Sequence, residues 1–307
     1  MPSIQKVAAI QMEGRVADLR YHIAQAGDLL EKALRSGAQI IALPEFFTTP
    51  IVLDERLFGC SVAAENPALD MLKSLAATHG AMIDGSYLAK RGDDVFNTYV
   101  LVDREGAVHT HDKDLPTMVE NAYYTGGKDD GLVATSHGSV GIAVCWETIR
   151  TATVRRLRGK VDLLMMGSHW WSEPGWRCPR WLMDQTHRDN LAMMAATPSR
   201  LSRMIGAPVL HAAHVGTVEG RFAITPNICC GRADIAIPTG GAGKAKLILS
   251  RKRPQRFVLP ECGLALIIPE GWIGRSAPTV STISRRCSLQ CRMIMSMTAT
   301  ASIIILS

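Results

Sequence analysis

Cys145 is the residue in this sequence whose type and place most directly suggest covalent chemistry. It ends the apolar run Val140–Val144, whose short, continuous pattern is typical of a strand covered on both faces. Sites in α/β sheets form at the ends of such strands, so a cysteine here is either a small core side chain or a nucleophile. The nucleophilic role requires a neighbouring group that lowers the pKa of the thiol or takes its proton.

Two other segments supply groups that could serve such a thiol. Glu45 follows the apolar run Ile40–Leu43 and Pro44, and an acidic side chain in that place is costly unless it is hydrogen-bonded or functional. Lys113 is the third candidate, in the segment His-Asp-Lys-Asp-Leu-Pro-Thr over residues 111–117. A soft nucleophile of this kind suits attack on an amide carbonyl or a nitrile carbon.

The elements that would position these residues alternate between strands and helices. Apolar spacing of three to four residues predicts helices, short apolar runs predict buried strands, and residues 81–102, interrupted by Arg-Gly-Asp-Asp at 91–94, predict an antiparallel hairpin. This alternation predicts an α/β layered domain with a mixed sheet. The predicted strands are Val7–Met12, Ile40–Leu43, Val140–Val144, Leu163–Gly167 and Pro208–His214, and the predicted helices are Ala17–Arg35, Leu69–His79 and Arg188–Arg203.

Four motifs in chain order resemble those of the nitrilase, or carbon-nitrogen hydrolase, superfamily, whose members share a Glu-Lys-Cys triad. Leu43-Pro44-Glu45 resembles the family's base motif, and Lys113 with Pro116-Thr117 resembles its lysine motif. Val144–Glu147 resembles the nucleophile motif, and Val7–Met12 resembles the first strand. The resemblance therefore implies that Glu45, Lys113 and Cys145 form the triad.

The same resemblance covers residues 4 to about 222 and implies a fold and an assembly. The fold is a four-layer α-β-β-α sandwich of the nitrilase type. The assembly is a homodimer or a higher homo-oligomer, and the activity is a hydrolase that needs neither a cofactor nor a metal.

Each residue type in the triad also has a chemical reason to be there. Glu45 can take the proton of Cys145, and Lys113 would hold positive charge against the tetrahedral intermediate, helped by the backbone N–H of Trp146. Glu120 matches a second glutamate of many family members, which orients the lysine and the substrate; the alternative is a solvated helix carboxylate. Burial would raise the pKa of Glu45 and the lysine charge would lower it, and the sequence leaves that balance open.

The segment after the predicted strand Leu163–Gly167 is where the family places residues that line the substrate pocket. We therefore assign His169 and Trp170, together with Trp146, to substrate binding, with core packing or a dimer contact as the alternative.

Other polar residues carry weaker signals. His109 and His111 alternate but lack a third nearby ligand, so we expect a solvated pair and no metal site. Arg155, Arg156 and Arg158 are expected to form an exposed, cationic end of a helix.

These residues predict a cofactor-free thiol hydrolase that cleaves a non-peptide carbon-nitrogen bond and releases ammonia. The substrate would be an amide or a nitrile of a small carboxylic acid. Cys145-Trp146-Glu147 is similar to the nitrilase branch, but Thr148-Ile149-Arg150 follows where that branch continues with Asn and then Met-Pro-Leu, so both substrate types stay open. The alternative from a different class is a non-catalytic or truncated family member with impaired assembly.

Composition limits the class and the partners of the protein. The 307 residues are 47% apolar and 20% charged, and no run approaches the roughly 18 apolar residues of a membrane helix, so we expect a soluble globular protein without a membrane partner. The N-terminal residues show no long apolar stretch with a cleavage site. We therefore expect a cytoplasmic, reducing location, in which the eight cysteines are thiols.

The last quarter of the chain differs from the rest. Residues 1 to 228 hold 23 Lys and Arg against 25 Asp and Glu, whereas residues 229 to 307 hold 11 against 3. We therefore divide the chain into a carbon-nitrogen hydrolase domain, residues 1–228, and an atypical basic segment, residues 229–307, which we expect to be poorly ordered. Its enrichment in Arg, Gly, Ser, Pro and Cys is what a frameshift in a GC-rich gene would produce. Because stacking aromatics do not accompany the charges, we predict no nucleic-acid partner.

Overall fold

A computed structural model describes residues 6–173, 180–221, 227–230, 233–236, 245–249 and 302–306. The α-helices are α1 (Leu19–Arg35), α2 (Pro67–His79), α3 (Thr151–Leu157) and α4 (Arg180–Ile205), and the 3-10 helices are η1 (Glu55–Gly59), η2 (Met118–Ala122) and η3 (Cys145–Ile149). The strands are β1 (Val7–Glu13), β2 (Ile40–Ala42), β3 (Met82–Arg91), β4 (Asp94–Val102), β5 (Val108–Asp112), β6 (Leu132–Thr135), β7 (Gly138–Val144), β8 (Leu163–Ser168), β9 (Trp171–Glu173), β10 (Val209–Val218), β11 (Asn227–Cys230), β12 (Asp234–Ala236), β13 (Ala245–Leu249) and β14 (Ser302–Leu306).

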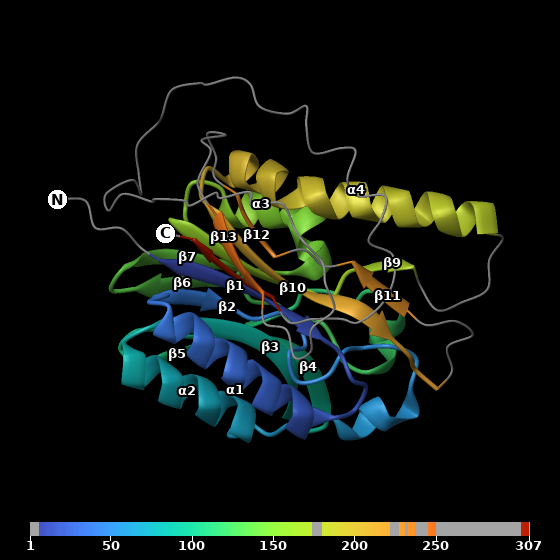
Figure 1. The fold of residues 1–307 in the computed structure, drawn as a ribbon, viewed down its shortest axis with the longest axis horizontal. Helices are drawn as coiled ribbons and strands as arrows, with labels where there is room; N and C mark the ends of the chain where they lie inside the picture. Colours follow the sequence, from blue (N-terminus) through green and yellow to red (C-terminus); the bar gives the residue numbers. More distant parts are fainter. Residues whose placement is uncertain are drawn as a thin grey trace.

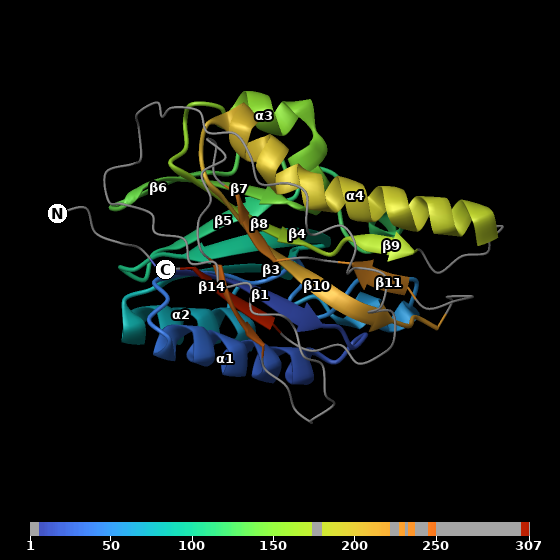
Figure 2. The ribbon, with the colours of Figure 1, turned by 45° about the horizontal axis from the view of Figure 1, so that its top comes forward.

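Two helical layers enclose two layers of strands in the described part of the chain. Helices α1 and α2 lie below the strands and α3 and α4 lie above them in Figure 1, and the turned view keeps this order (Figure 2). Hydrogen-bonded neighbours run through both β-layers in the order β5-β4-β3-β2-β1-β10-β8-β7-β6. The predicted four-layer α-β-β-α sandwich is confirmed.

The two β-layers meet along strand β1. Its last residues, Gln11–Glu13, pair in parallel with Ala213–Val215 of β10. Its earlier residues, Val7–Gln11, pair with β14 on the same side. Strand β1 is also parallel to β2, and β3 and β4 form an antiparallel hairpin, so the sheet is mixed, as predicted.

Three apolar layers hold the four layers of secondary structure together. One apolar layer lies between α1, α2 and the half-sheet of strands β1–β5, and a second lies between this half-sheet and the other one, which contains β6, β7, β8 and β10. The third lies between that other half-sheet and helices α3 and α4. Each fully buried aliphatic side chain contributes roughly 1.5–3 kcal/mol of transfer free energy to the stability of this arrangement. Representative members are Leu30 and Ile83 in the first layer, Leu101 and Ile142 in the second, and Leu164 and Leu201 in the third.

The ends of α1 and α2 agree with the sequence patterns. Asp18 caps α1 by accepting a hydrogen bond from the backbone N–H of Tyr21. Helix α2 has Pro67 in its first turn and ends at Gly80, whose φ of 57° is the left-handed conformation that glycine adopts without strain. Helix α4 extends beyond the predicted range in both directions.

Close approach between the two half-sheets depends on a glycine of β8. A Cβ atom at Gly167 would lie 2.6 Å from the backbone nitrogen of Glu45 and 2.8 Å from the ring of Tyr99. Real Cβ atoms essentially never come so near a backbone atom. Gly167 therefore lets β8 contact the segment that carries Glu45.

Most of residues 229–307 lie outside the described residues, so the predicted domain division stays a prediction. The described parts of this segment are short strands: β12 and β11 pair with β10, and β13 pairs with β14, which pairs with β1. Among the described residues, none of the helices is both long and apolar enough to cross a membrane.

Candidate active site

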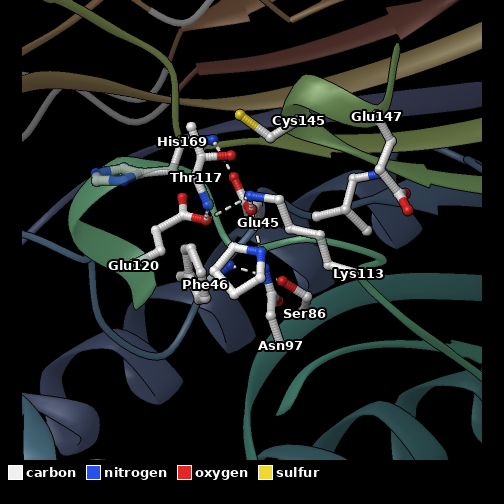
Figure 3. Close-up of polar contacts among 12 residues, drawn as sticks. Glu45, Phe46, Ser86, Asn97, Lys113, Thr117, Glu120, Cys145, Glu147 and His169 are labelled. Atoms are coloured by element: carbon white, nitrogen blue, oxygen red, sulfur yellow. Dashed lines mark hydrogen bonds and ion pairs between the residues drawn. The ribbon is translucent and has the colours of Figure 1, made fainter. Parts of the chain in front are cut away.

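Three strand ends bring the predicted triad together. Glu45 follows β2, Lys113 follows β5, and Cys145 begins η3 directly after β7. Figure 3 shows the side chains of these three residues and of Glu120 gathered around one point. Neighbouring strands fix the backbone beside two of them, because Ser86 Oγ accepts from the N–H of the residue after Glu45, at 2.8 Å, and the N–H of Lys113 donates to the carbonyl of Asn97, at 3.0 Å.

Glu45 is fully buried and its carboxylate accepts three hydrogen bonds. Oε1 accepts from Lys113 Nζ and from Asn97 Nδ2, both at 2.9 Å, and Oε2 accepts from the backbone N–H of His169 at 2.8 Å. Burial raises the pKa of Glu45 to about 7, because it outweighs the opposing charge of Lys113 and is reinforced by the charge of Glu120. Burial therefore decides the balance that the sequence left open.

Lys113 forms two ion pairs in a fully buried position. Its Nζ atom lies 2.9 Å from Glu45 Oε1 and 2.6 Å from Glu120 Oε2. Burial acts to lower the pKa of Lys113, but the charges of Glu120 and Glu45 outweigh it and hold this pKa well above the ordinary lysine value. The ammonium group is therefore charged across the neutral pH range.

Glu120 is not the solvated helix carboxylate of the alternative interpretation. It is buried, and besides Lys113 its Oε2 atom accepts from the backbone N–H of Thr117, at 2.8 Å, and from the Tyr124 hydroxyl. Because one oxygen holds all three donors, the carboxylate is fixed against Lys113.

The Cys145 thiol is buried and stands on a strained turn. Its φ of 49° is left-handed, a conformation that costs a non-glycine residue on the order of 1–3 kcal/mol and that is typical of functional sites. Burial, reinforced by the charge of Glu45, raises the pKa of the thiol well above its ordinary value against the opposing charge of Lys113. At neutral pH the sulfur therefore carries its proton, and its activation requires transfer of that proton to a base.

A pocket of about 240 Å³ opens onto Cys145 and Glu120. The Trp146 and Trp170 rings form one wall with centroids 6.3 Å apart, and Trp171 Nε1 donates to His169 Nδ1 at 3.3 Å. Trp146, His169 and Trp170, which the sequence assigned to substrate binding, all line it. The full lining is Thr117, Met118, Glu120, Cys145, Trp146, His169, Trp170, Trp171, Thr186 and Asn190.

A second charged cluster lies behind the nucleophile, and sequence analysis missed it. His111 is buried rather than solvated: its Nε2 atom lies 3.0 Å from Glu147 Oε2, and its Nδ1 atom contacts Asp129. Arg156 lies 3.3 Å from the same Glu147 oxygen and is partly buried, whereas Arg155 and Arg158 are exposed at the end of α3, as predicted. The signal was present in the spacing, since His111 and Glu147 each lie two residues from a triad member. Within the described residues, no group of three or more His, Cys, Asp and Glu side chains is arranged to hold a metal ion.

The sequence matches the family model of the carbon-nitrogen hydrolases over residues 6–195. The chain belongs to the carbon-nitrogen hydrolase family. Among curated relatives, a probable nitrilase of Schizosaccharomyces pombe is 22% identical over 179 residues, which cover 53% of this chain and 63% of that protein. The chloroplastic omega-amidase of Arabidopsis thaliana is 26% identical over 43% of this chain and 40% of that protein. The matched region thus spans about half the length of these relatives.

Solved structures of carbon-nitrogen hydrolases share the fold. An amidase from Nesterenkonia sp. superposes with a TM-score of 0.63 at 19% identity and covers 78% of this chain and 84% of its own. A CN-hydrolase superfamily protein from Xanthomonas campestris gives a TM-score of 0.58 at 19% identity, over 76% of this chain and 89% of its own. At this identity the likeness concerns the fold alone.

Proposed function

We propose that this protein is a thiol hydrolase that cleaves the carbon-nitrogen bond of an amide or a nitrile of a small carboxylic acid and releases ammonia. The observation that carries the proposal is the arrangement of Cys145 on the wall of a small pocket, with a carboxylate of pKa about 7 and a buried ammonium group gathered beside it. These are a nucleophile, a base and a cation, which the reaction requires at one place.

In the first half of the amide reaction, the Cys145 sulfur attacks the carbonyl carbon and its proton passes to Glu45. The C=O electron pair moves onto oxygen, where Lys113 Nζ and the backbone N–H of Trp146 stabilise the negative charge. The intermediate then collapses: Glu45 gives the proton to the nitrogen and the carbon-nitrogen bond breaks. Ammonia departs, and the acyl group remains on Cys145 as a thioester.

In the second half, water attacks the thioester carbon while Glu45 takes one of its protons. Collapse of this intermediate breaks the carbon-sulfur bond, gives the carboxylic acid and returns the proton to the sulfur. A nitrile enters the same route through a thioimidate, which one water molecule converts to the thioester with loss of ammonia.

The pKa of Glu45 suits this alternation of roles. A base that takes and returns a proton works best when its pKa lies near the operating pH. The value of about 7 for Glu45 meets this condition. An ordinary glutamate, with a pKa near 4.5, is a weaker base and would take the thiol proton less readily.

Two further observations support the substrate class. The pocket of about 240 Å³ lies below the usual range of roughly 300–1,000 Å³ for drug-sized ligands, which favours a small acyl group. One variant of the Nesterenkonia sp. amidase carries the acetamide moiety of fluoroacetamide, covalently added at its active-site cysteine. By analogy, we assign the same nucleophilic role to Cys145.

Ammonia release from a panel of small amides and nitriles tests the proposal. We expect turnover of at least one class by the wild-type protein and none by Cys145→Ala, which removes the sulfur but little volume. Cys60→Ala is the matched control, because Cys60 is also a buried free cysteine and lies outside the pocket lining. It should keep wild-type turnover. No turnover by the wild type on any substrate would favour the non-catalytic alternative, and full activity in Cys145→Ala would exclude Cys145 as the nucleophile.

We also propose that the protein assembles as a homodimer or a higher homo-oligomer in the cytoplasm. The support is the resemblance to the family and the sequence composition. Light scattering after size-exclusion chromatography tests the assembly, and a monodisperse monomer would contradict it.

A further inference from the structure

Glu147 closes the turn on which the nucleophile stands. Its side chain is fully buried, and Oε2 accepts a hydrogen bond of 2.6 Å from the backbone N–H of Val144, the residue before Cys145. This bond spans Cys145 itself, whose φ of 49° needs support from the surrounding structure. The Glu147 carboxylate therefore supports the left-handed turn at the nucleophile.

The other oxygen of the same carboxylate reaches the segment that carries the lysine. Oε1 accepts a hydrogen bond of 3.0 Å from the backbone N–H of Asp114, the residue after Lys113. One carboxylate thus joins the backbone next to Cys145 to the backbone next to Lys113. Figure 3 shows Glu147 on the opposite side of Cys145 from Glu120, so the group acts from behind the site.

Two cations hold this carboxylate in place. His111 Nε2 lies 3.0 Å and Arg156 Nη2 lies 3.3 Å from Glu147 Oε2, and His111 is in turn paired with Asp129. Hydrogen bonds to Asp129 and Glu147 overcome the effect of burial and raise the pKa of His111 to about 9. The cluster therefore pairs two positive with two negative groups at neutral pH, and it fixes Glu147 without leaving a buried charge unpaired.

We propose that Glu147, oriented by His111, is a positioning residue that sets the placement of the Cys145 sulfur relative to Lys113 and Glu45. The inference rests on the proposed function for its catalytic consequence, but the placement of the sulfur can be measured without a substrate. Misplacement of about 1 Å costs an enzyme on the order of 100-fold in rate, so loss of this bridge has a large effect.

The first test compares Glu147→Gln with Asp103→Asn. Glutamine places an NH₂ group where one backbone N–H must donate, so one of the two bridging hydrogen bonds is lost. Asp103 is a matched control, because it also accepts from two backbone N–H groups and pairs with a histidine, His109, but at the other end of β5. The kcat of each variant is normalised to the concentration of folded protein, measured by circular dichroism on the fraction purified by size-exclusion chromatography, so that unfolded protein is not counted.

We expect kcat of Glu147→Gln to fall about 100-fold with KM within about threefold of the wild-type value. Asp103→Asn should keep wild-type kcat. The kcat of His111→Gln, which keeps a donor toward Glu147 but loses the ion pair with Asp129, should fall about tenfold. This variant takes the place of Glu147→Gln in the test if Glu147→Gln does not fold. Wild-type kcat in Glu147→Gln, or an equal loss in Asp103→Asn, overturns the proposal.

The second test needs no turnover and separates this inference from the proposed function. The alkylation rate of Cys145 by iodoacetamide, followed by mass spectrometry with Cys60 as the internal reference, reports how well Glu45 and Lys113 face the sulfur. We expect at least a tenfold lower rate in Glu147→Gln than in Asp103→Asn or the wild type. An unchanged or higher rate overturns the positioning role. If the wild type releases no ammonia but Cys145 is alkylated more slowly in Glu147→Gln, the positioning role is supported and the proposed function fails.

Discussion

Glu45 and Glu147 are equally buried, but their pKa values and their charged partners differ. Burial raises the pKa of Glu45 to about 7, whereas hydrogen bonding and the charges of His111 and Arg156 lower that of Glu147 to about 2 against the same effect of burial. Glu45 shares the single charge of Lys113 with Glu120, while Glu147 faces two cations. The proton affinity of a buried carboxylate therefore depends on the cations available to it and not on burial alone.

In the proposed mechanism, this difference separates a group that exchanges protons, Glu45, from a group that holds structure, Glu147. With a pKa near neutrality Glu45 can take and return a proton at little cost. Glu147 is a permanent anion that accepts two backbone hydrogen bonds. The proposed function gives both clusters a place at one site, because a nucleophile must be activated and must also be held in place.

The largest expected effect comes from neutralising the proton-exchanging member of the pair. Glu45→Gln keeps the shape of the side chain but removes the base and one of its two acceptor oxygens, so kcat/KM should fall about 1,000-fold, within the usual range for a general base. This loss should exceed that in Glu147→Gln by about tenfold. Steady-state ammonia release measures both, with Glu31→Gln, an exposed residue of α1, as the control. Equal losses in the two buried variants would remove the functional distinction between them.

A second substitution removes the cation that Glu45 and Glu120 share. Lys113→Ala should lose stabilisation of the oxyanion worth about 3 kcal/mol, or roughly 100-fold in kcat/KM, and should leave two buried carboxylates without their partner. Lys90→Ala, an exposed lysine of β3, is the control for loss of positive charge. Wild-type turnover in Lys113→Ala would show that the ammonium group does not face the reacting oxygen.

The pH dependence of catalysis should report the titration of Glu45. Because the base must be deprotonated before it can take the thiol proton, kcat/KM should rise with pH and level off above a midpoint near 7. The residual activity of Glu45→Gln should lack this limb. A wild-type midpoint near 4.5 would mean that burial does not raise the pKa of Glu45 as the structure indicates.

The smallest expected effects are on stability, and they should have opposite signs for the two glutamates. Folding lowers the pKa of Glu147, so the stability that its charge contributes is present above pH 4.5 and is lost as pH falls toward 2. Between pH 5 and pH 3, the free energy of unfolding of the wild type should fall by about 2 kcal/mol relative to that of Glu147→Gln. The pKa of Glu45 is raised by folding, so its contribution is present below pH 4.5. That contribution is lost as pH rises through about 7. Between pH 5 and pH 8, the free energy of unfolding of the wild type should fall by about 2 kcal/mol relative to that of Glu45→Gln. Urea unfolding at these pH values measures both differences, and slopes of the same sign would contradict the comparison.

Much of the architecture was predictable because it depends on local patterns. The apolar runs ending at Glu45 and Cys145 predicted strands β2 and β7, and the motif with Lys113 predicted a third segment at the same site. The hairpin β3–β4 followed from a four-residue polar interruption. Helix α4 begins before the predicted Arg188 and ends after the predicted Arg203, and Pro198 lies inside both the predicted and the observed helix.

The partners of the buried charges were not predictable in the same way. His111 was expected to be solvated because the sequence shows no third metal ligand near His109 and His111, and Arg156 was expected to be exposed because it lies in a cationic end of a helix. Both meet Glu147 through the tertiary fold, His111 from 36 positions away in the sequence.

The sequence by itself determined which residue types stand at the strand ends, and hence the family and the candidate triad. Only the tertiary structure decided which buried carboxylate has a pKa near neutrality. Glu45 receives a backbone hydrogen bond from His169, 124 positions later, and an ion pair from Lys113, 68 positions later. A pKa is set by the burial and the charges that surround a group in space, and a single sequence does not contain those distances.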